Sequence, residues 1–379
     1  NQSDSEFVFY FQQIQKMKKR FNNFNKNLLM LSVFLSAFLF FSCSGDGGGT
    51  TGGETIVKPT NLTISASPIG GSTQNPNGDG SGTVSFTFSA TNATSYKIAL
   101  GDGETKETTT GSLTYTYNAS GTNSYTVYVS AYNGSQFVST SVALTIYVAP
   151  KAIWADEFNV YGAPDGTKCA YDLVNGEWGW GNNEAQYYTN RPENVKVLNG
   201  KLIITPIKES YQGSNYTSAR IKTQGKFSFK YGKVEIKAKL PIGGGTWPAL
   251  WMLGNNITTA SWPACGEIDI MEHVGNSQNK IYGTLHYPNF SGGNAVSKTT
   301  NIANASTEFH IYSLDWRADT IKFYVDDILF HTFTNNSALP FNQNFFLIIN
   351  CAMGGNFGGA INPNFTSSTF EVDYIRVFN

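Results

Sequence analysis

The chain has 379 residues, enough for two domains and a leader, and its net charge at pH 7 is −1. Charged residues make up 14% of it and aromatic residues another 14%, and 38 residues are glycine, a composition that suits an exported all-β protein better than a helical cytosolic one. The small net charge gives no reason to expect nucleic acid as a partner, and no glycine-rich motif joins a strand to a helix as a nucleotide site would require.

Residues 1–43 are predicted to be a leader and signal segment. Met17-Lys-Lys-Arg20 precedes an apolar run at 28–41, which is too short to span a membrane but suits a secretory signal. The run ends at Ser42-Cys43, which looks like a lipobox and predicts Cys43 as the lipidated first residue of the exported protein. An ordinary cleaved signal with a chance cysteine is the alternative. We therefore expect an exported protein, lipid-anchored in the cell envelope or at the cell surface, or secreted.

Residues 44–56 are rich in glycine and predict a flexible tether. Residues 57–148 follow with short strands of alternating pattern, for example at 83–89 and 124–132, and with a tight turn at Gly101-Asp102-Gly103. This pattern predicts an immunoglobulin-like β-sandwich, and the stretches at 96–103 and 115–129 resemble PKD domains. The segment holds no histidine and no acid pair suited to catalysis, so we expect a spacer.

Residues 149–379 form the second predicted domain. Alternating polar and apolar segments recur along it without a long helical pattern, which indicates a second antiparallel β-sandwich. Asp326-Asp327 separates two of these segments and reads as a hairpin turn rather than as a catalytic acid pair.

The most informative segment is Gly266-Glu-Ile-Asp-Ile-Met-Glu-His273, which places three acids in an otherwise apolar strand. Alternation puts Glu267 and Asp269 on one face and would put Glu272 on the other. If Met271 is the extra residue of a β-bulge, Glu272 returns to the face of the other two acids. The carboxyl groups of Glu267 and Glu272 could then approach to roughly 5–6 Å, the spacing of a retaining glycosidase. An acidic edge strand or a cation site is the alternative.

This segment resembles the bulged signature of glycoside hydrolase family 16. Further motifs of that family occur in order, at 178–188 (Trp-Gly-Trp-Gly-Asn-Asn-Glu-Ala-Gln-Tyr-Tyr), 216–227, 231–241 and 245–253. The likeness covers roughly residues 150 to 379 and is greatest to bacterial laminarinases, which are endo-β-1,3-glucanases. It implies a curved, jelly-roll β-sandwich with a substrate cleft along the concave sheet. The full expectation is an all-β chain in which this catalytic domain follows the immunoglobulin-like sandwich.

The resemblance also assigns roles. It implies Glu267 as the nucleophile, Glu272 as the acid/base and Asp269 as the residue that holds the nucleophile. Catalysis needs no cofactor. The positions that match substrate-binding residues of the family are Trp180, Asn183, Arg220, Trp247, Trp251 and His286. The sequence departs from the family at Phe357, where tryptophan is frequent, which leaves the subsites at that end open.

One structural calcium ion is a further implication of the resemblance. Glu157 and Asp373 match family positions that often bind it, together with a backbone carbonyl near Gly200. Two solvated acids are the alternative.

Several functional alternatives stay open. Relatives in the same family cut agars, carrageenans or mixed-linkage glucans, and a surface lipoprotein could bind glycans without hydrolysing them. The retained acids disfavour a purely binding role. A sulfated substrate would need clustered cations, and only Arg220 and Lys222 lie close to the motifs. The expected partners are therefore a β-glucan polysaccharide and, through the lipid anchor, a membrane, with the protein itself a monomer.

Overall fold

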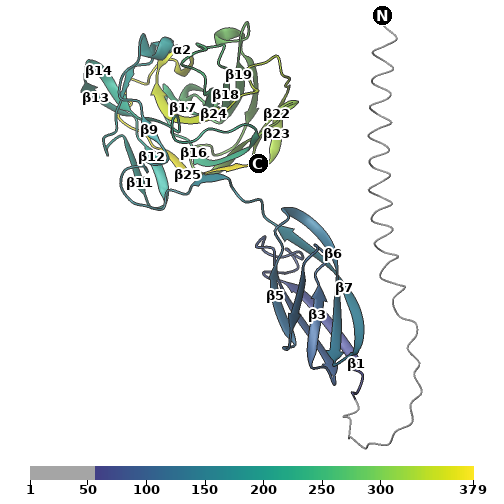
Figure 1. The fold of residues 1–379 in the computed structure, drawn as a ribbon. Helices are drawn as coiled ribbons and strands as arrows, with labels where there is room; N and C mark the ends of the chain where they lie inside the picture. The colour runs from purple at the N-terminus through teal and green to yellow at the C-terminus, as the bar shows by residue number, and fades with distance from the viewer. Residues whose placement is uncertain (1–55) are drawn as a thin grey trace, which may run out of the picture.

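The computed structural model describes residues 56–379, so the signal segment, Cys43 and nearly all of the tether lie outside the described residues. Figure 1 shows two bodies of β-structure that follow one another along the chain. The all-β prediction is confirmed. Within the described range no helix has the length and apolarity needed to cross a membrane.

The first body is a sandwich of a three-stranded sheet (β1-β2-β5) and a four-stranded sheet (β4-β3-β6-β7). Inward residues of both sheets, such as Phe86 and Val129, form one buried cluster. Alternation explains why these strands form: in β2 and in the second half of β6, every second residue is buried and the residues between are more exposed. The strands are β1 (Thr60–Pro68), β2 (Thr83–Thr91), β3 (Ser95–Ala99), β4 (Thr105–Thr108), β5 (Ser112–Thr116), β6 (Gly121–Asn133) and β7 (Gln136–Val148).

The second body also has two large sheets, and their facing side chains form a single core. One sheet runs β11-β12-β25-β16-β21-β22-β23, with β8 paired to β25. Its strands are β8 (Trp154–Asp156), β11 (Val195–Leu198), β12 (Lys201–Ile204), β16 (Gly232–Lys239), β21 (His310–Trp316), β22 (Thr320–Val325), β23 (Ile328–Thr334) and β25 (Phe370–Phe378). As predicted, Asp326 and Asp327 form the turn between β22 and β23, both with positive φ.

The opposite sheet carries the predicted catalytic strand near its centre, in the order β20-β19-β18-β17-β24-β15-β9. Its strands are β9 (Ala170–Tyr171), β15 (Arg220–Lys222), β17 (Thr246–Gly254), β18 (Glu267–His273), β19 (Lys280–His286), β20 (Val296–Asn301) and β24 (Phe345–Met353). Short helical turns lie in the connections: η1 (Gly179–Asn183), η2 (Gly275–Ser277), η3 (Gly292–Asn294) and α2 (Gly355–Gly358).

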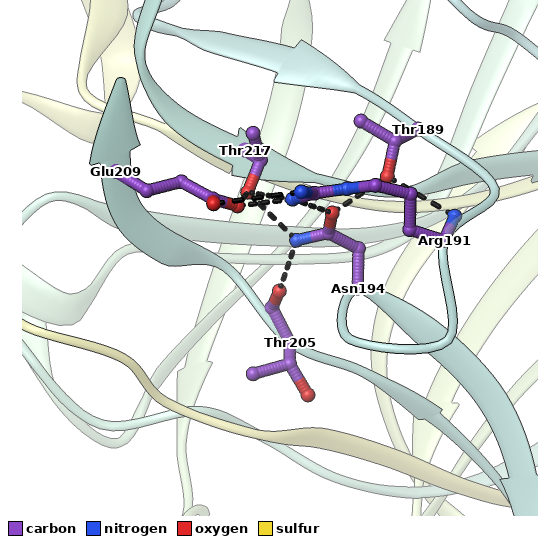
Figure 2. Close-up of polar contacts among 6 residues, drawn as sticks. All are labelled: Thr189, Arg191, Asn194, Thr205, Glu209 and Thr217. Carbon is purple, nitrogen blue, oxygen red and sulfur yellow. Dashed lines mark hydrogen bonds and ion pairs between the residues drawn. The ribbon is translucent and has the colours of Figure 1, made fainter. Parts of the chain in front are cut away.

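A small third sheet is formed by β10 (Gln186–Tyr188), β13 (Ile207–Tyr211) and β14 (Ser214–Ser218), in the order β10-β14-β13. Figure 2 shows the polar cluster that ties it to the loop after β10. The guanidinium of Arg191 donates to Glu209 and, at 3.0 Å, to Asn194 Oδ1. The buried Asn194 in turn donates to Thr217 Oγ1 at 2.9 Å and to the carbonyl of Thr205 at 3.0 Å. This Arg191 cluster therefore fixes the β13–β14 hairpin against the chain that leads into β11.

Candidate active site

The predicted bulge lies in the middle of β18. On β17, Trp251 is opposite Asp269 and Leu250 is opposite Met271, so Ile270 has no partner residue there. On β19 the register also shifts between Asp269 and Glu272. The bulge is confirmed, with the difference that Ile270 rather than Met271 is the residue left out of the β17 register. Ile270 and Met271 both pack into the core, which returns Glu272 to the face of the other two acids.

Glu267 begins β18, and its carboxylate is held by residues from outside that strand. Trp262, in the loop that precedes β18, donates its indole N–H to Glu267 Oε2 at 3.0 Å. His286 lies directly opposite Glu267 on β19, with Nε2 at 3.6 Å from Glu267 Oε1. Burial and the neighbouring Asp269 raise the pKa of the Glu267 carboxyl well above its ordinary value.

Glu272 has a different set of partners. Trp247, on β17, donates its indole N–H to Glu272 Oε1 at 3.1 Å. Burial raises the pKa of Glu272, while His286, Trp247 and Thr284 oppose that rise by favouring the ionised form. The two glutamates therefore share one face of the sheet but are anchored by different tryptophans. Because their hydrogen-bond donors differ, the two carboxyl groups can differ in rotamer and in pKa.

Asp269 lies between the glutamates and is almost fully buried. Burial and then the charge of Glu272 raise its pKa well above the ordinary value. His286 Nε2 is 3.2 Å from Asp269 Oδ2, a close contact that is not aligned as a hydrogen bond. Three carboxyl groups in such a site cannot all ionise cheaply, so the cluster retains at least one proton where free carboxyls would be ionised.

The tautomer of His286 follows from its other ring nitrogen. The backbone N–H of Gly292 donates to His286 Nδ1 at 3.2 Å, so Nδ1 is an acceptor and the neutral ring carries its proton on Nε2. That N–H faces Glu267 and Asp269. One potential ligand atom from each of Glu267, Asp269 and His286 lies within 4.8 Å of the others, a spacing that would also suit a metal site. Because Nε2 carries a proton, it has no lone pair to offer to a metal. The arrangement therefore fits a role of His286 in positioning the carboxylates better than a role in binding a metal.

Arg220 joins two of the predicted tryptophans. Its guanidinium lies 4.0 Å from the ring centre of Trp180 and 4.8 Å from that of Trp251. Arg220 Nε is also 3.0 Å from Asp172 Oδ2, as an ion pair without an aligned hydrogen bond. Trp251 donates its own N–H to Asn350 Oδ1 at 2.7 Å. Arg220, Trp180 and Trp251 therefore form one group, and Trp251 lies opposite Asp269 on the neighbouring strand.

The remaining predicted residue, Asn183, lies in η1 and donates to Asn356 Oδ1 at 2.8 Å, which joins η1 to α2. Phe357, also in α2, packs edge-on against Trp247 with ring centres 5.4 Å apart and against Tyr282 at 5.0 Å. The phenylalanine thus supports the tryptophan that holds Glu272. The departure from the family pattern lies on the Glu272 side of the site.

Several polar residues of the site had no predicted role. Trp262 is half-exposed and contacts Glu267 from a loop without periodic pattern, so nothing in the sequence distinguishes it. Asn350 donates to the hydroxyl of Tyr188 at 2.9 Å, and that hydroxyl donates to Glu184 at 3.2 Å. Glu184 and Tyr188 lie in the 178–188 motif, and their place in that motif is the sequence signal that could have identified them as residues of the site. Burial raises the pKa of Glu184.

The residues expected to bind calcium have partners within the chain. Arg376 donates to both carboxylate oxygens of Glu157, at 2.8 and 2.9 Å, and lowers the pKa of Glu157. Lys237 Nζ is 2.8 Å from Asp373 Oδ2. In this arrangement the two carboxylates do not fit a cation site, because calcium would have to displace both basic side chains. Calcium binding stays a prediction, and no step of the chemistry depends on it.

Two glutamates on one face of a bulged strand, in a β-sandwich and beside tryptophan rings, define a glycoside hydrolase. The family model described as "Glycosyl hydrolases family 16" matches residues 180–376 of the chain. The chain belongs to that family.

Individual relatives agree with this assignment. A β-glucanase of Rhodothermus marinus is 43% identical over 242 residues, which are 60% of this chain and 84% of the relative. Glucan endo-1,3-β-glucosidase A1 of Niallia circulans is 40% identical over 258 residues, which are 60% of this chain and 37% of the relative. The laminarinase structure from Rhodothermus marinus superposes with a TM-score of 0.58 at 42% identity, covering 61% of this chain and 97% of that structure.

Proposed function

We propose that the protein is a retaining endo-β-1,3-glucanase that acts on laminarin-type polysaccharides. The observation that carries the proposal is the bulge at Ile270–Met271, which puts Glu267 and Glu272 on one face. The names of the similar proteins, a β-glucanase and a glucan endo-1,3-β-glucosidase, support the choice of polymer.

The reaction has two displacements. Glu267 attacks the anomeric carbon while Glu272 gives its proton to the departing glycosidic oxygen, so that a covalent glycosyl ester forms on Glu267. Glu272, now ionised, takes a proton from water, and the resulting hydroxide displaces Glu267. Asp269 and the indole N–H of Trp262 hold the Glu267 carboxylate in its attacking orientation, and the Nε2–H of His286 faces it at 3.6 Å.

The division of roles between the two glutamates rests on the family resemblance. Glu272 must hold a proton at the outset, and its burial raises its pKa in that direction. Formation of the ester removes the charge of Glu267, and the pKa of Glu272 then falls, which suits a base. The indole N–H of Trp247 favours the ionised form of Glu272 and helps the second step.

The surroundings of the acids favour a neutral polymer over a sulfated one. The two cations near the motifs, Arg220 and Lys222, both pair with Asp172, at 3.0 and 2.6 Å. Both cations therefore share one carboxylate, that of the residue that follows β9, so neither is without a partner, although the trio keeps one net positive charge. A sulfate-rich carrageenan would need cations that are free to meet it.

Two measurements test the proposal. Reducing-sugar release on laminarin, lichenan, agarose, carrageenan and xylan should be greatest on laminarin. Proton NMR early in laminarin hydrolysis should show the β-anomer at the new reducing end before mutarotation. The α-anomer appearing first would overturn the retaining mechanism, and hydrolysis of only one of the other polymers would overturn the assigned substrate.

We also propose export and lipid attachment through Cys43, with the sandwich at 57–148 acting as a PKD-like module between the anchor and a monomeric enzyme. The support is the signal-like segment before Cys43 and the glycine-rich tether after it. Replacement of Cys43 by serine should release the protein from the membrane fraction. A native protein without an acyl chain would contradict this part of the proposal.

A further inference from the structure

The outer face of the β6–β7 hairpin carries exposed aromatic rings that the proposed function does not use. Strands β6 and β7 pair along their full length, and their inward residues belong to the core of the first body. Their outward residues include Tyr128, Tyr132 and Phe137. Tyr128 is 56% exposed and Phe137 is 51% exposed, although large rings on a sheet normally find cover.

The rings are positioned as two contact points along the hairpin. Tyr132 and Phe137 are opposite one another, and their rings stack with centres 5.3 Å apart. Tyr128 lies four residues back along β6, which corresponds to about 13 Å at the rise of a strand. A linear ligand that runs along the strands would meet the stacked pair first and then Tyr128.

The residues between these rings are small and hydroxylated. Every outward residue of β6 from Thr122 to Tyr132 carries a hydroxyl group, and on β7 only Phe137 and Ala143 do not. Ser130 and Ser139 are hydrogen-bonded to each other at 2.7 Å. Such short side chains leave the faces of the rings uncovered.

The charges of this face identify the chemistry of the ligand. The outward positions of β6 and β7 are uncharged. Lys97 of β3 lies beside Ser130, but it pairs with Glu107 of β4 at 3.2 Å. Nucleic acid or an anionic membrane would require free basic residues. Protein interfaces are enriched in arginine as well as in aromatic residues, and the outward positions of β6 and β7 carry no arginine. Flat apolar rings among hydroxyl groups match the ring faces and edges of a neutral sugar polymer.

We propose that this face, the β6–β7 outer face, is a second glycan-binding surface that holds a neutral polysaccharide while the active site cleaves it. The identity of that polysaccharide as β-1,3-glucan rests on the proposed function. Binding by a tethered module raises the local concentration of the polymer at the active site, chiefly for insoluble substrates.

The test uses the full chain with Glu267→Gln, so that the polymer is not cut during binding. Depletion from solution by insoluble β-1,3-glucan is compared with and without Tyr128→Ala and Phe137→Ala together. We expect the double alanine variant to bind about tenfold more weakly. The variant with Tyr128→Phe and Phe137→Tyr should bind like the parent because it keeps both rings. Tyr161→Ala, which removes a ring that is 78% exposed in the second body, is the matched control and should not change binding.

Activity separates this proposal from the proposed function. In the active chain the double alanine variant should retain its rate on short soluble oligosaccharides and lose severalfold on insoluble glucan. Unchanged adsorption of a folded double alanine variant, or an equal loss in the Tyr161→Ala control, would overturn the second surface. Failure of the wild type to release sugar from soluble laminarin would instead overturn the proposed function, whatever the adsorption result.

Discussion

The indole N–H of Trp247 donates a 3.1 Å hydrogen bond to Glu272 from the strand beside it. Ala249, two residues further along β17, is opposite Glu272, so the ring of Trp247 reaches diagonally across the pair of strands. This donor favours the ionised carboxylate and offsets part of the rise in pKa that burial causes. The same ring rests on Phe357, so packing and proton affinity are linked at one residue.

Trp247→Phe should therefore move the pH profile. Removal of the donor raises the pKa of Glu272, which must be protonated to act as the acid. The alkaline limb of kcat/KM against pH should then shift upward by about one unit. Trp251→Phe is the matched control, because its indole donates to Asn350 rather than to an acid and the limb should stay in place. A limb that is unmoved or lower in Trp247→Phe would contradict the role of this hydrogen bond.

Glu267→Gln and Glu272→Gln should each lower activity by about three orders of magnitude or more and make the fold more stable at neutral pH. Both carboxyls have pKa values raised by burial above the ordinary 4.5, so the wild type loses stability as pH rises from there. The amides do not ionise. Their melting temperatures should exceed that of the wild type by a few degrees at pH 7, and the gap should close towards pH 4.5.

The exposed Glu193→Gln is the control for that comparison, and its melting temperature should stay with the wild type. Wild-type turnover in either active-site variant would refute the mechanism. A drop in melting temperature at pH 7 would show that the carboxylates stabilise the fold rather than strain it.

The parts of the site that could be predicted lie within single strands. Alternation around Ile268 and Ile270 predicted the face of the acids, and the bulge followed from the extra apolar residue before Glu272. The family resemblance implied His286 only as a substrate-binding residue. Its position opposite Glu267 became visible in the structure, where β19 pairs with β18.

The contacts that could not be predicted join residues through loops. Trp262 contacts Glu267 from a loop, and loops have no hydrophobic periodicity from which such a contact could be predicted. Phe357 contacts Trp247 because α2 follows β24 in the fold. Arg376 and Glu157 are 219 residues apart in the sequence and meet because β25 pairs with β8, a pairing that local pattern does not encode. Such side-chain pairs depend on the tertiary fold rather than on local pattern, so a motif can identify an acid without revealing which residues tune it.

His273, the last residue of β18, should make the protein sensitive to acid. The side chain is fully buried, neither ring nitrogen has a hydrogen-bond partner within the described chain, and burial lowers its pKa from 6.5 to about 4. A depressed pKa gives stability above pH 6.5 that is lost as pH falls towards 4, worth about 3 kcal/mol. His273→Phe and His273→Leu should flatten the fall in melting temperature over that range. An unchanged slope in both variants would assign the acid sensitivity to other groups.

Arg191→Met should destabilise the fold by about 1–3 kcal/mol, because it leaves Glu209 without its cation and removes one of the two donors to Asn194 Oδ1. Arg191 lowers the pKa of Glu209, so the stability that this pair supplies should be present above pH 4.5 and lost below it. The matched control is Arg317→Met, whose partner Asp315 lies on a surface where Arg317 is 68% exposed, and there we expect a change within about 0.5 kcal/mol. Denaturant unfolding of both variants, of Glu209→Gln and of the Arg191→Met, Glu209→Gln double variant measures the coupling between Arg191 and Glu209. If the two single arginine variants lose equal stability, the Arg191 cluster behaves as an ordinary surface ion pair and does not hold the β13–β14 hairpin in place.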